Sequence, residues 1–204
     1  MHEDATLSRS AIQELVRRAP AVLGRPLEDE EVERFDRYLD ILGRWNRIHR
    51  LVGSNDPAWI VERLLLDSLL FTRLLPPGVQ RVADLGSGPG IPGIPLKIVS
   101  PGLEMVLIEA RRKRVSFLRA VIRNLNLTSV EVFEGRLEPD MSLESPVDAV
   151  VSRCAGQPVA VARLGSRLVR AGGIVIIAGA PRGTSGFPGE HVEVLGRHFL
   201  IAKS

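Results

Sequence analysis

The sequence has little of what disulfide, zinc and membrane proteins need. A single cysteine, Cys154, among 204 residues excludes a disulfide within the chain, and the four histidines are scattered without the spacing of zinc ligands. There is no run of about 18 apolar residues and no basic leader before an apolar stretch, so the sequence predicts neither a membrane span nor a secretion signal. We therefore expect a cytoplasmic protein that binds no metal.

Aromatic residues are also scarce, at 4%, whereas 45% hydrophobic and 25% charged residues are typical of a globular protein. A chain of this length buries roughly 70% of its unfolded surface and needs no covalent cross-links. The charge is unevenly distributed. Residues 1–78 contain 11 Lys and Arg and 13 Asp and Glu. Residues 79–204 contain 16 Lys and Arg and 11 Asp and Glu. We expect the second part to attract polyanions.

The first 75 residues have helical patterns. Ser10 and Gln13 have the spacing of a capping box, and Gly24 follows as a stop. Apolar residues then recur at three- and four-residue steps, and Asp56 before Pro57 is typical of a helix start. The expected helices span residues 10–24, 28–53 and 56–75.

The pattern changes after the dipeptide Pro76-Pro77. Short runs rich in β-branched residues now alternate with helical patterns, which predicts an α/β fold with a mostly parallel, twisted sheet. The last two runs are almost adjacent and are expected to form an antiparallel pair at the sheet edge. We divide the chain into an N-terminal helical extension, 1–78, and an α/β domain, 79–204. The expected strands are 81–85, 104–109, 130–133, 147–152, 173–179, 191–196 and 198–204, and the clearest helices between them are 111–125 and 157–170.

A glycine-rich loop follows the first of these strands, in the segment "VADLGSGPGIPGIPL". Gly86, Gly88 and Gly90 lie at the carboxyl end of the strand, where open α/β sheets bind their ligands. The dinucleotide fingerprint requires a glycine at the sixth position, which here is Ile91. The spacing therefore weakens the prediction of a nicotinamide cofactor.

Two acids flank this loop. Asp84 precedes it and would repel a pyrophosphate, whereas a cationic ligand would be favoured. Glu109 ends the second strand, at a position where an acid accepts hydrogen bonds from ribose hydroxyls. S-adenosylmethionine, which has an ammonium, a sulfonium and a ribose, fits this pattern. The alternative is a glycine turn that serves packing, with two solvated acids.

Several segments resemble one bacterial family. "DLGSGPGIPGIPL", "EARRKRVSFLRAV", "FEGRLE" and "VVSRCA", preceded by "RWNRI" and "DSLL", resemble the small-subunit ribosomal RNA guanine-N7 methyltransferases, the RsmG or glucose-inhibited division protein B family. The resemblance runs from about Trp45 to Arg170. It implies a Rossmann-like class I methyltransferase fold behind an N-terminal helical extension. It also implies methyl transfer from S-adenosylmethionine to N7 of a guanine in 16S rRNA. The substrate would be free rRNA or a 30S particle, and we expect the protein to be a monomer.

The resemblance also implies cofactor positions. Gly86 and Ile91 match the turn residues that border the cofactor, and Leu137 and Glu138 match the pair beside the adenine. All of them follow strands on one rim of the predicted sheet, where ligands bind in such folds.

Arg153 matches the family's arginine after the fourth strand, on the cofactor and substrate side. Arginine commonly binds N7 and O6 of guanine, so Arg153 is the candidate for holding the base. An ion pair with Asp148 or Glu138 is the structural alternative. Guanine N7 has a free lone pair, so the reaction needs positioning and no general base, which fits the lack of a catalytic dyad.

A basic segment begins directly after Glu109. It contains Arg111, Arg112, Lys113 and Arg114, and no acid occurs before Glu131. On a helix whose apolar side packs on the sheet, these cations are expected to bind RNA phosphates. A solvated helix face with no ligand is the alternative.

The sequence departs from the family pattern at several positions on the RNA side. Arg50 and Val52 stand where the family usually has Asn and Thr, and Leu64 stands where it usually has a histidine. The C-terminal loop lacks the family's lysine and the helix that normally follows it. These changes leave open another RNA target, or a non-catalytic RNA-binding protein.

Two other methyl-transfer reactions are alternatives. Cys154 could attack a pyrimidine, as in carbon-5 methyltransferases, but cysteine is more often buried and inert. Adenine N6 transfer would require an Asn/Asp-Pro-Pro-aromatic motif after the fourth strand, which "SRCAGQPV" lacks.

Overall fold

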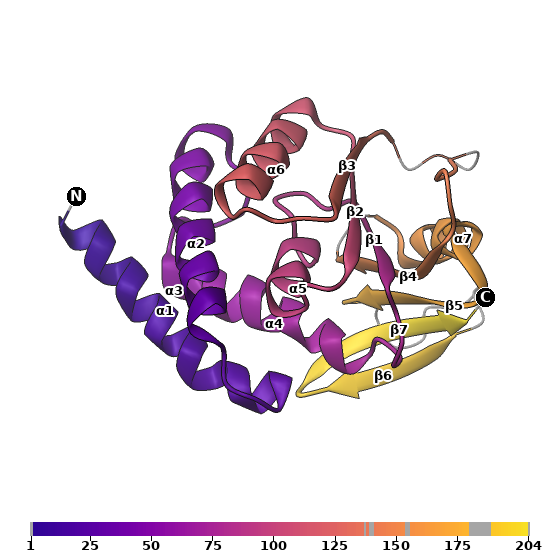
Figure 1. The fold of residues 1–204 in the computed structure, drawn as a ribbon, viewed down its shortest axis with the longest axis horizontal. Helices are drawn as coiled ribbons and strands as arrows, with labels where there is room; N and C mark the ends of the chain where they lie inside the picture. The colour runs from indigo at the N-terminus through magenta and orange to yellow at the C-terminus, as the bar shows by residue number, and fades with distance from the viewer. Residues whose placement is uncertain (1, 137, 139–140, 154–155, 180–188, 204) are drawn as a thin grey trace.

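The computed structural model describes residues 2–136, 138, 141–153, 156–179 and 189–203. Figure 1 shows a helical N-terminal part packed beside a twisted sheet, with the C-terminal hairpin at one sheet edge. No helix in the described ranges has both the length and the hydrophobicity that a bilayer span requires. The same residues contain no cluster of His, Cys, Asp and Glu that could hold a metal ion.

The N-terminal part is helical as predicted, but its first helix begins earlier. It starts at His2, so the capping box predicted at Ser10 is wrong. Residues 2–9 contain no glycine or proline to interrupt a helix, and the turns therefore continue upstream of Ser10. Gly24 ends the helix with a φ of 75°, and its N–H donates to the Pro20 carbonyl at 2.9 Å. The helical segments are α1 (His2–Leu23), α2 (Asp29–His49), α3 (Pro57–Ile60), η1 (Val61–Leu65), α4 (Leu66–Leu69) and η2 (Leu70–Arg73).

The caps of the next two helices follow local sequence. Glu28 and Glu31 form a reciprocal capping box at the start of α2. The predicted cap at Asp56 is confirmed, because its carboxylate accepts the Ala58 N–H at 3.0 Å. The segment 57–73 is one continuous helical run whose middle, η1, is a wider π-type turn.

The sheet has seven strands in the order β3-β2-β1-β4-β5-β7-β6. The first five strands in this order are parallel, and β7 is antiparallel to both β5 and β6, as the sequence predicts. The topology reverses at β1, which lies between β2 and β4, and this is the position where such sheets bind ligands. The strands are β1 (Arg81–Leu85), β2 (Glu104–Glu109), β3 (Val130–Glu134), β4 (Val147–Arg153), β5 (Val169–Ala178), β6 (Glu190–Val194) and β7 (Arg197–Lys203).

Three helices belong to the α/β part: α5 (Gly93–Val99), α6 (Arg112–Asn124) and α7 (Pro158–Leu168). The two predicted helices correspond to α6 and α7. The helix α5 was not predicted, because its residues lie in a segment rich in glycine and proline.

The strands bury both faces of the sheet. Val82, Leu107 and Val151 belong to the hydrophobic cluster with α5, α6 and the N-terminal helices, whereas Ala83 and Val150 belong to the cluster with α7. This alternation follows the two-residue period of a strand.

The N-terminal helices share the larger cluster with the sheet. Rings of α2 pack on α6, with centroids 5.6 Å apart for Trp45 and Phe117 and 6.5 Å apart for Tyr38 and Phe117. The boundary proposed at residue 78 lies in the loop between η2 and β1. Because one cluster crosses this boundary, we expect both parts to unfold together.

Candidate functional site

The glycine loop connects β1 to α5 at the carboxyl edge of the sheet. Gly86, Gly88 and Gly90 have φ values of 71°, 58° and 90°, a backbone region that favours glycine. The Gly86 and Ser87 N–H groups donate to the Ile108 carbonyl at 3.0 and 2.9 Å, which fixes the loop to β2.

The glycines of the loop have different roles. A Cβ on Gly90 would lie 2.4 Å from Cγ1 of Ile94, so this glycine is required for packing within the loop. A Cβ on Gly88 would lie 3.6 Å from a guanidinium nitrogen of Arg114 and 3.8 Å from the Gly86 carbonyl oxygen. Gly88 is buried, and these are ordinary van der Waals distances, so it is the positive φ and not lack of space that favours glycine at this position.

Asp84 lies beneath this loop and is fully buried. One carboxylate oxygen accepts the Gly93 N–H at 3.0 Å, and the other has no hydrogen-bond partner among the described residues. Burial is the main cause that raises the pKa of Asp84, to about 7, from 3.8. The acid thus supports the loop from below and keeps one unpaired oxygen.

Gly93 was missed by the sequence analysis, although it is the fourth glycine of the same segment. A Cβ there would lie 2.8 Å from the Asp84 carboxylate and 2.4 Å from Leu107. Only glycine lets the backbone approach Asp84 closely enough to donate its N–H.

Tyr38 was also missed. It is the only tyrosine of the chain, it is fully buried in α2, and its hydroxyl donates to the Pro89 carbonyl at 2.8 Å. The helical extension therefore holds the glycine loop in place. The one feature of the sequence that could have identified Tyr38 is its position next to the apolar residues of its helix.

Glu109 is nearly buried at the end of β2, with 5% of its surface exposed. Its carboxylate accepts the N–H groups of Gly88, at 2.9 Å, and Arg111, at 2.8 Å. Arg114 lies 3.6 Å from the same carboxylate. Since Asp84 and Glu109 are both buried against the loop, the alternative of two solvated acids is wrong.

These features fit S-adenosylmethionine. The unpaired oxygen of Asp84 and the charge of Glu109 favour a cationic ligand that carries hydroxyl donors. A pyrophosphate at the same loop would lie beside Glu109 and Asp84, and the ionised form of each acid would repel it.

Arg153 ends β4 and points toward the helical extension. One of its terminal nitrogens donates to the Arg63 carbonyl at 2.7 Å and lies 3.9 Å from the Asp67 carboxylate. The structural alternative, an ion pair of Arg153, is therefore observed, but with Asp67 as the partner. The prediction of Asp148 as that partner is wrong, because Asp148 pairs with Arg170 at 2.6 Å, and no pair with Glu138 is found among the described residues.

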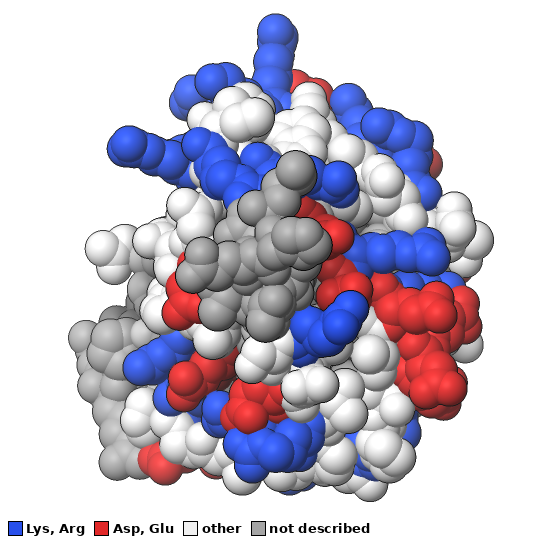
Figure 2. Space-filling model, turned by 90° about the vertical axis from the view of Figure 1, so that its left-hand side faces the viewer, with Lys and Arg blue, Asp and Glu red and all other residues white. Residues whose placement is uncertain are grey.

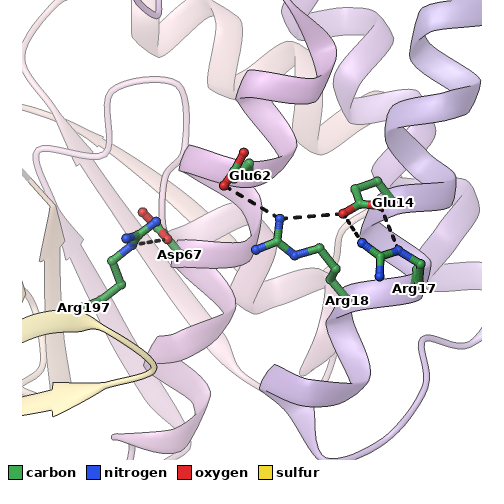
Figure 3. A network of polar contacts seen from close by, with 6 residues as sticks. All are labelled: Glu14, Arg17, Arg18, Glu62, Asp67 and Arg197. Atoms are coloured by element: carbon green, nitrogen blue, oxygen red, sulfur yellow. Dashed lines mark hydrogen bonds and ion pairs between the residues drawn. The ribbon is translucent and has the colours of Figure 1, made fainter.

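Asp67 also binds the C-terminal hairpin. Its carboxylate accepts a hydrogen bond from Nε of Arg197, on β7, at 2.8 Å (Figure 3). The helical extension, β4 and β7 therefore meet at one carboxylate beside the sheet's carboxyl edge. Sequence reasoning used Asp67 only as part of a motif and missed Arg197.

For the remaining predicted positions the structure gives burial at most, and no contact that indicates a role. Glu138 follows β3 and is exposed. Leu137, Cys154 and the C-terminal loop at 180–188 lie outside the described residues. Leu64 is buried in the hydrophobic cluster.

The basic segment forms the start of α6. Arg111, Arg112 and Lys113 are exposed, and Arg114 is half-buried. The opposite side of the helix is apolar and packs in the core, as predicted. Lys and Arg side chains gather in the upper part of the face seen in Figure 2, at the height where Figure 1 places α6 and the end of α2.

Residues 31–182 match the GidB family, described as rRNA small subunit methyltransferase G. The chain belongs to this family. GidB membership confirms the resemblance on which the sequence analysis relied. It also makes the chain an S-adenosylmethionine-dependent methyltransferase that acts on small-subunit rRNA, and decides against a nicotinamide cofactor.

Curated relatives and solved structures agree with the GidB match. The chain is 40% identical over 143 residues to ribosomal RNA small subunit methyltransferase G of Dichelobacter nodosus, covering 70% of this chain and 67% of that protein. It is 38% identical over 165 residues to the protein of that name in Xylella fastidiosa, covering 80% and 74%. A SAM-dependent methyltransferase from Aquifex aeolicus superposes with a TM-score of 0.52 at 18% identity, covering 78% of this chain and 97% of that one, and supports the fold.

Proposed function

We propose that this chain transfers the methyl group of S-adenosylmethionine to N7 of a guanine in 16S rRNA. The observation that carries the proposal is the glycine loop at the carboxyl end of β1, with Asp84 and Glu109 buried against it, in a chain of the GidB family. When bound, S-adenosylmethionine supplies an electrophilic methyl group. The protein's task is then to orient guanine N7, since no proton has to be removed from it.

The cofactor side is assigned to the loop and its two acids. Gly86, Gly88, Gly90 and Ile91 supply the backbone wall, and Asp84 supplies negative potential beneath it. The carboxylate of Glu109 holds two N–H groups, and each oxygen has a second lone pair for a ribose hydroxyl. Leu137 and Glu138 are proposed, on the family pattern, to lie beside the adenine.

Arg153 is assigned to the guanine. Its contact with the Arg63 carbonyl uses one of five N–H donors, which leaves others for O6 of the base. Because this contact fixes the guanidinium at the carboxyl end of β4, Arg153 is held at the rim that also carries the glycine loop.

The RNA backbone is assigned to Arg111, Arg112, Lys113 and Arg114. They begin α6 beside the glycine loop, so a strand bound there would pass close to the cofactor side. We infer that the chain works as a cytoplasmic monomer on free rRNA or a 30S particle.

The proposal is tested by methyl incorporation. Purified protein, labelled S-adenosylmethionine and 16S rRNA from cells that lack the gene are expected to yield 7-methylguanine at one position. Calorimetry with S-adenosylmethionine and with NADH is run in parallel. Binding of NADH alone would overturn the cofactor, binding of S-adenosylmethionine without transfer would indicate a non-catalytic RNA-binding protein, and a label on another base or RNA would overturn the substrate.

A further inference from the structure

We infer that the cavity between the α2–α3 loop and α6 binds a backbone phosphate of the RNA substrate. This inference rests on the proposed function and names a contact that the glycine loop does not supply. The cavity has a volume of about 590 Å³ and is lined by residues 50–55, by Asn46 beneath them, and by Arg114 of α6.

The charge of this lining favours an anion. It contains the guanidinium groups of Arg50 and Arg114 and no acid. Arg114 also lies 3.6 Å from the Glu109 carboxylate, so Arg50 supplies the uncompensated charge. Guanidinium groups bind phosphate oxygens with charge-assisted, often bidentate, hydrogen bonds.

Two other hollows of the described surface differ in this respect. In the groove between α1, α2 and α3, Arg47 lies with Asp40 and Asp56. In the hollow at the amino ends of β1 and β2, Arg81 lies with Glu104 and Glu131. Those acids offset the positive charge, so neither hollow attracts an anion as the α2–α6 cavity does.

The loop that carries Arg50 is held in one conformation by a buried amide. Asn46 is 3% exposed, and its side chain donates to the Ser54 carbonyl at 2.9 Å and to the Asn55 side chain at 2.7 Å. Its oxygen accepts the Val52 N–H at 2.8 Å. The loop is therefore preorganised, which reduces the entropy lost when a ligand binds.

Arg50 itself ends α2 in the left-handed region, with φ of 49° and ψ of 58°. This conformation is unfavourable for a residue other than glycine. It turns the chain out of the helix while the Arg50 N–H still donates to the Asn46 carbonyl, at 2.9 Å. The Arg50 side chain is exposed and has no ion pair within the described part of the chain, so its charge is available.

Arg114 connects this cavity to the cofactor side. Its guanidinium is 3.6 Å from the Glu109 carboxylate and is the neighbour of Gly88 described above. Arg114 therefore belongs both to the cavity lining and to the surroundings of the glycine loop, whereas none of the described residues that line the cavity is a glycine of that loop. Arg114 follows three exposed cations, residues 111–113, along the chain, which gives a polyanion more than one contact.

The test compares Arg50→Gln with Arg44→Gln, a matched loss of one exposed α2 arginine that does not line the cavity. For Arg50→Gln we expect about tenfold weaker binding of 16S rRNA and a salt slope reduced by about one. Arg44→Gln is expected to change affinity less than threefold. Arg50→Lys should restore much of the salt slope, because it keeps the charge.

Each outcome decides the inference. An unchanged RNA affinity and salt slope in Arg50→Gln, with a wild-type circular dichroism spectrum, would overturn the phosphate site. A loss of S-adenosylmethionine affinity with unchanged RNA binding would overturn it in favour of a cofactor carboxylate. Failure of the wild-type protein to methylate rRNA would instead refute the proposed function, because RNA binding is measured without turnover.

Discussion

Asp67, in the helical extension, accepts a hydrogen bond from Nε of Arg197, on the last strand, at 2.8 Å. The same carboxylate lies 3.9 Å from Arg153, the arginine assigned to the guanine. Asp67 thus joins the helical extension to the last strand, beside the end of β4. We regard it as a positioning residue that acts through Arg153.

Asp67→Asn is expected to lower kcat for methyl transfer about tenfold, because the amide holds two guanidinium groups less firmly than a carboxylate does. Binding of S-adenosylmethionine should change less than twofold. The matched control is Glu62→Gln, which removes an acid of the same helical run that pairs with Arg18 at 3.8 Å (Figure 3). Equal effects of both variants on kcat, or an unchanged kcat in Asp67→Asn, would contradict the role of Asp67.

Gly93→Ala is expected to disturb the glycine loop. The added methyl would lie 2.8 Å from the Asp84 carboxylate and 2.4 Å from Leu107, both in the core. We expect a loss of about 1–3 kcal/mol in the free energy of unfolding, as for other overpacked sites, and weaker binding of S-adenosylmethionine. Gly102→Ala, where a Cβ would meet nothing within 4 Å, is the control. Denaturant titration and calorimetry measure both effects, and a Gly93→Ala protein as stable as the control would refute the close approach.

The pH dependence of stability should report Asp84. Its pKa is raised to about 7 in the folded chain, from 3.8. Between these values the folded chain keeps a proton that the unfolded chain has released, so the free energy of unfolding falls as pH rises through this window. In Asp84→Asn this contribution is absent. The Tm of the wild type relative to the variant should therefore decrease by roughly several degrees from pH 5 to pH 8.

Cofactor binding should show the opposite trend. Because the ionised form of Asp84 favours a cationic ligand, the affinity for S-adenosylmethionine should rise as pH increases through about 7. The affinity of Asp84→Asn should be lower and nearly flat across the same range. Parallel pH profiles for the two proteins would show that Asp84 has no part in binding.

Reversal of charge at Arg111 and Arg112 should weaken rRNA binding and reduce its salt dependence. Both side chains are exposed at the start of α6, although Arg112 also lies 3.5 Å from Glu134. The double variant Arg111→Glu, Arg112→Glu is compared with Arg17→Glu, an exposed α1 arginine paired with Glu14 at 2.6 Å. Filter binding across salt concentrations gives the slope, and a slope equal to that of Arg17→Glu would count against this surface.

Much of the fold follows from local sequence patterns. The β-branched runs predict the strands, and the cap at Asp56 and the stop at Gly24 are correct because both depend on neighbouring residues. The start of α1 was wrong because nothing upstream of Ser10 interrupts the helix. The helix α5 was missed because its glycine and proline residues read as a loop.

The residues of the candidate site also fall into two groups, those that local sequence predicts and those that only the packing of the chain brings together. The sequence by itself determined the glycine loop and the acids at the ends of β1 and β2, since a strand fixes where the residues that follow it lie. Only the tertiary structure decided that Tyr38 holds Pro89, that Asp67 holds Arg197, and that Arg50 faces Arg114. These partners are far apart along the chain. Their contacts depend on how the helical extension packs against the sheet, and no local pattern encodes that packing.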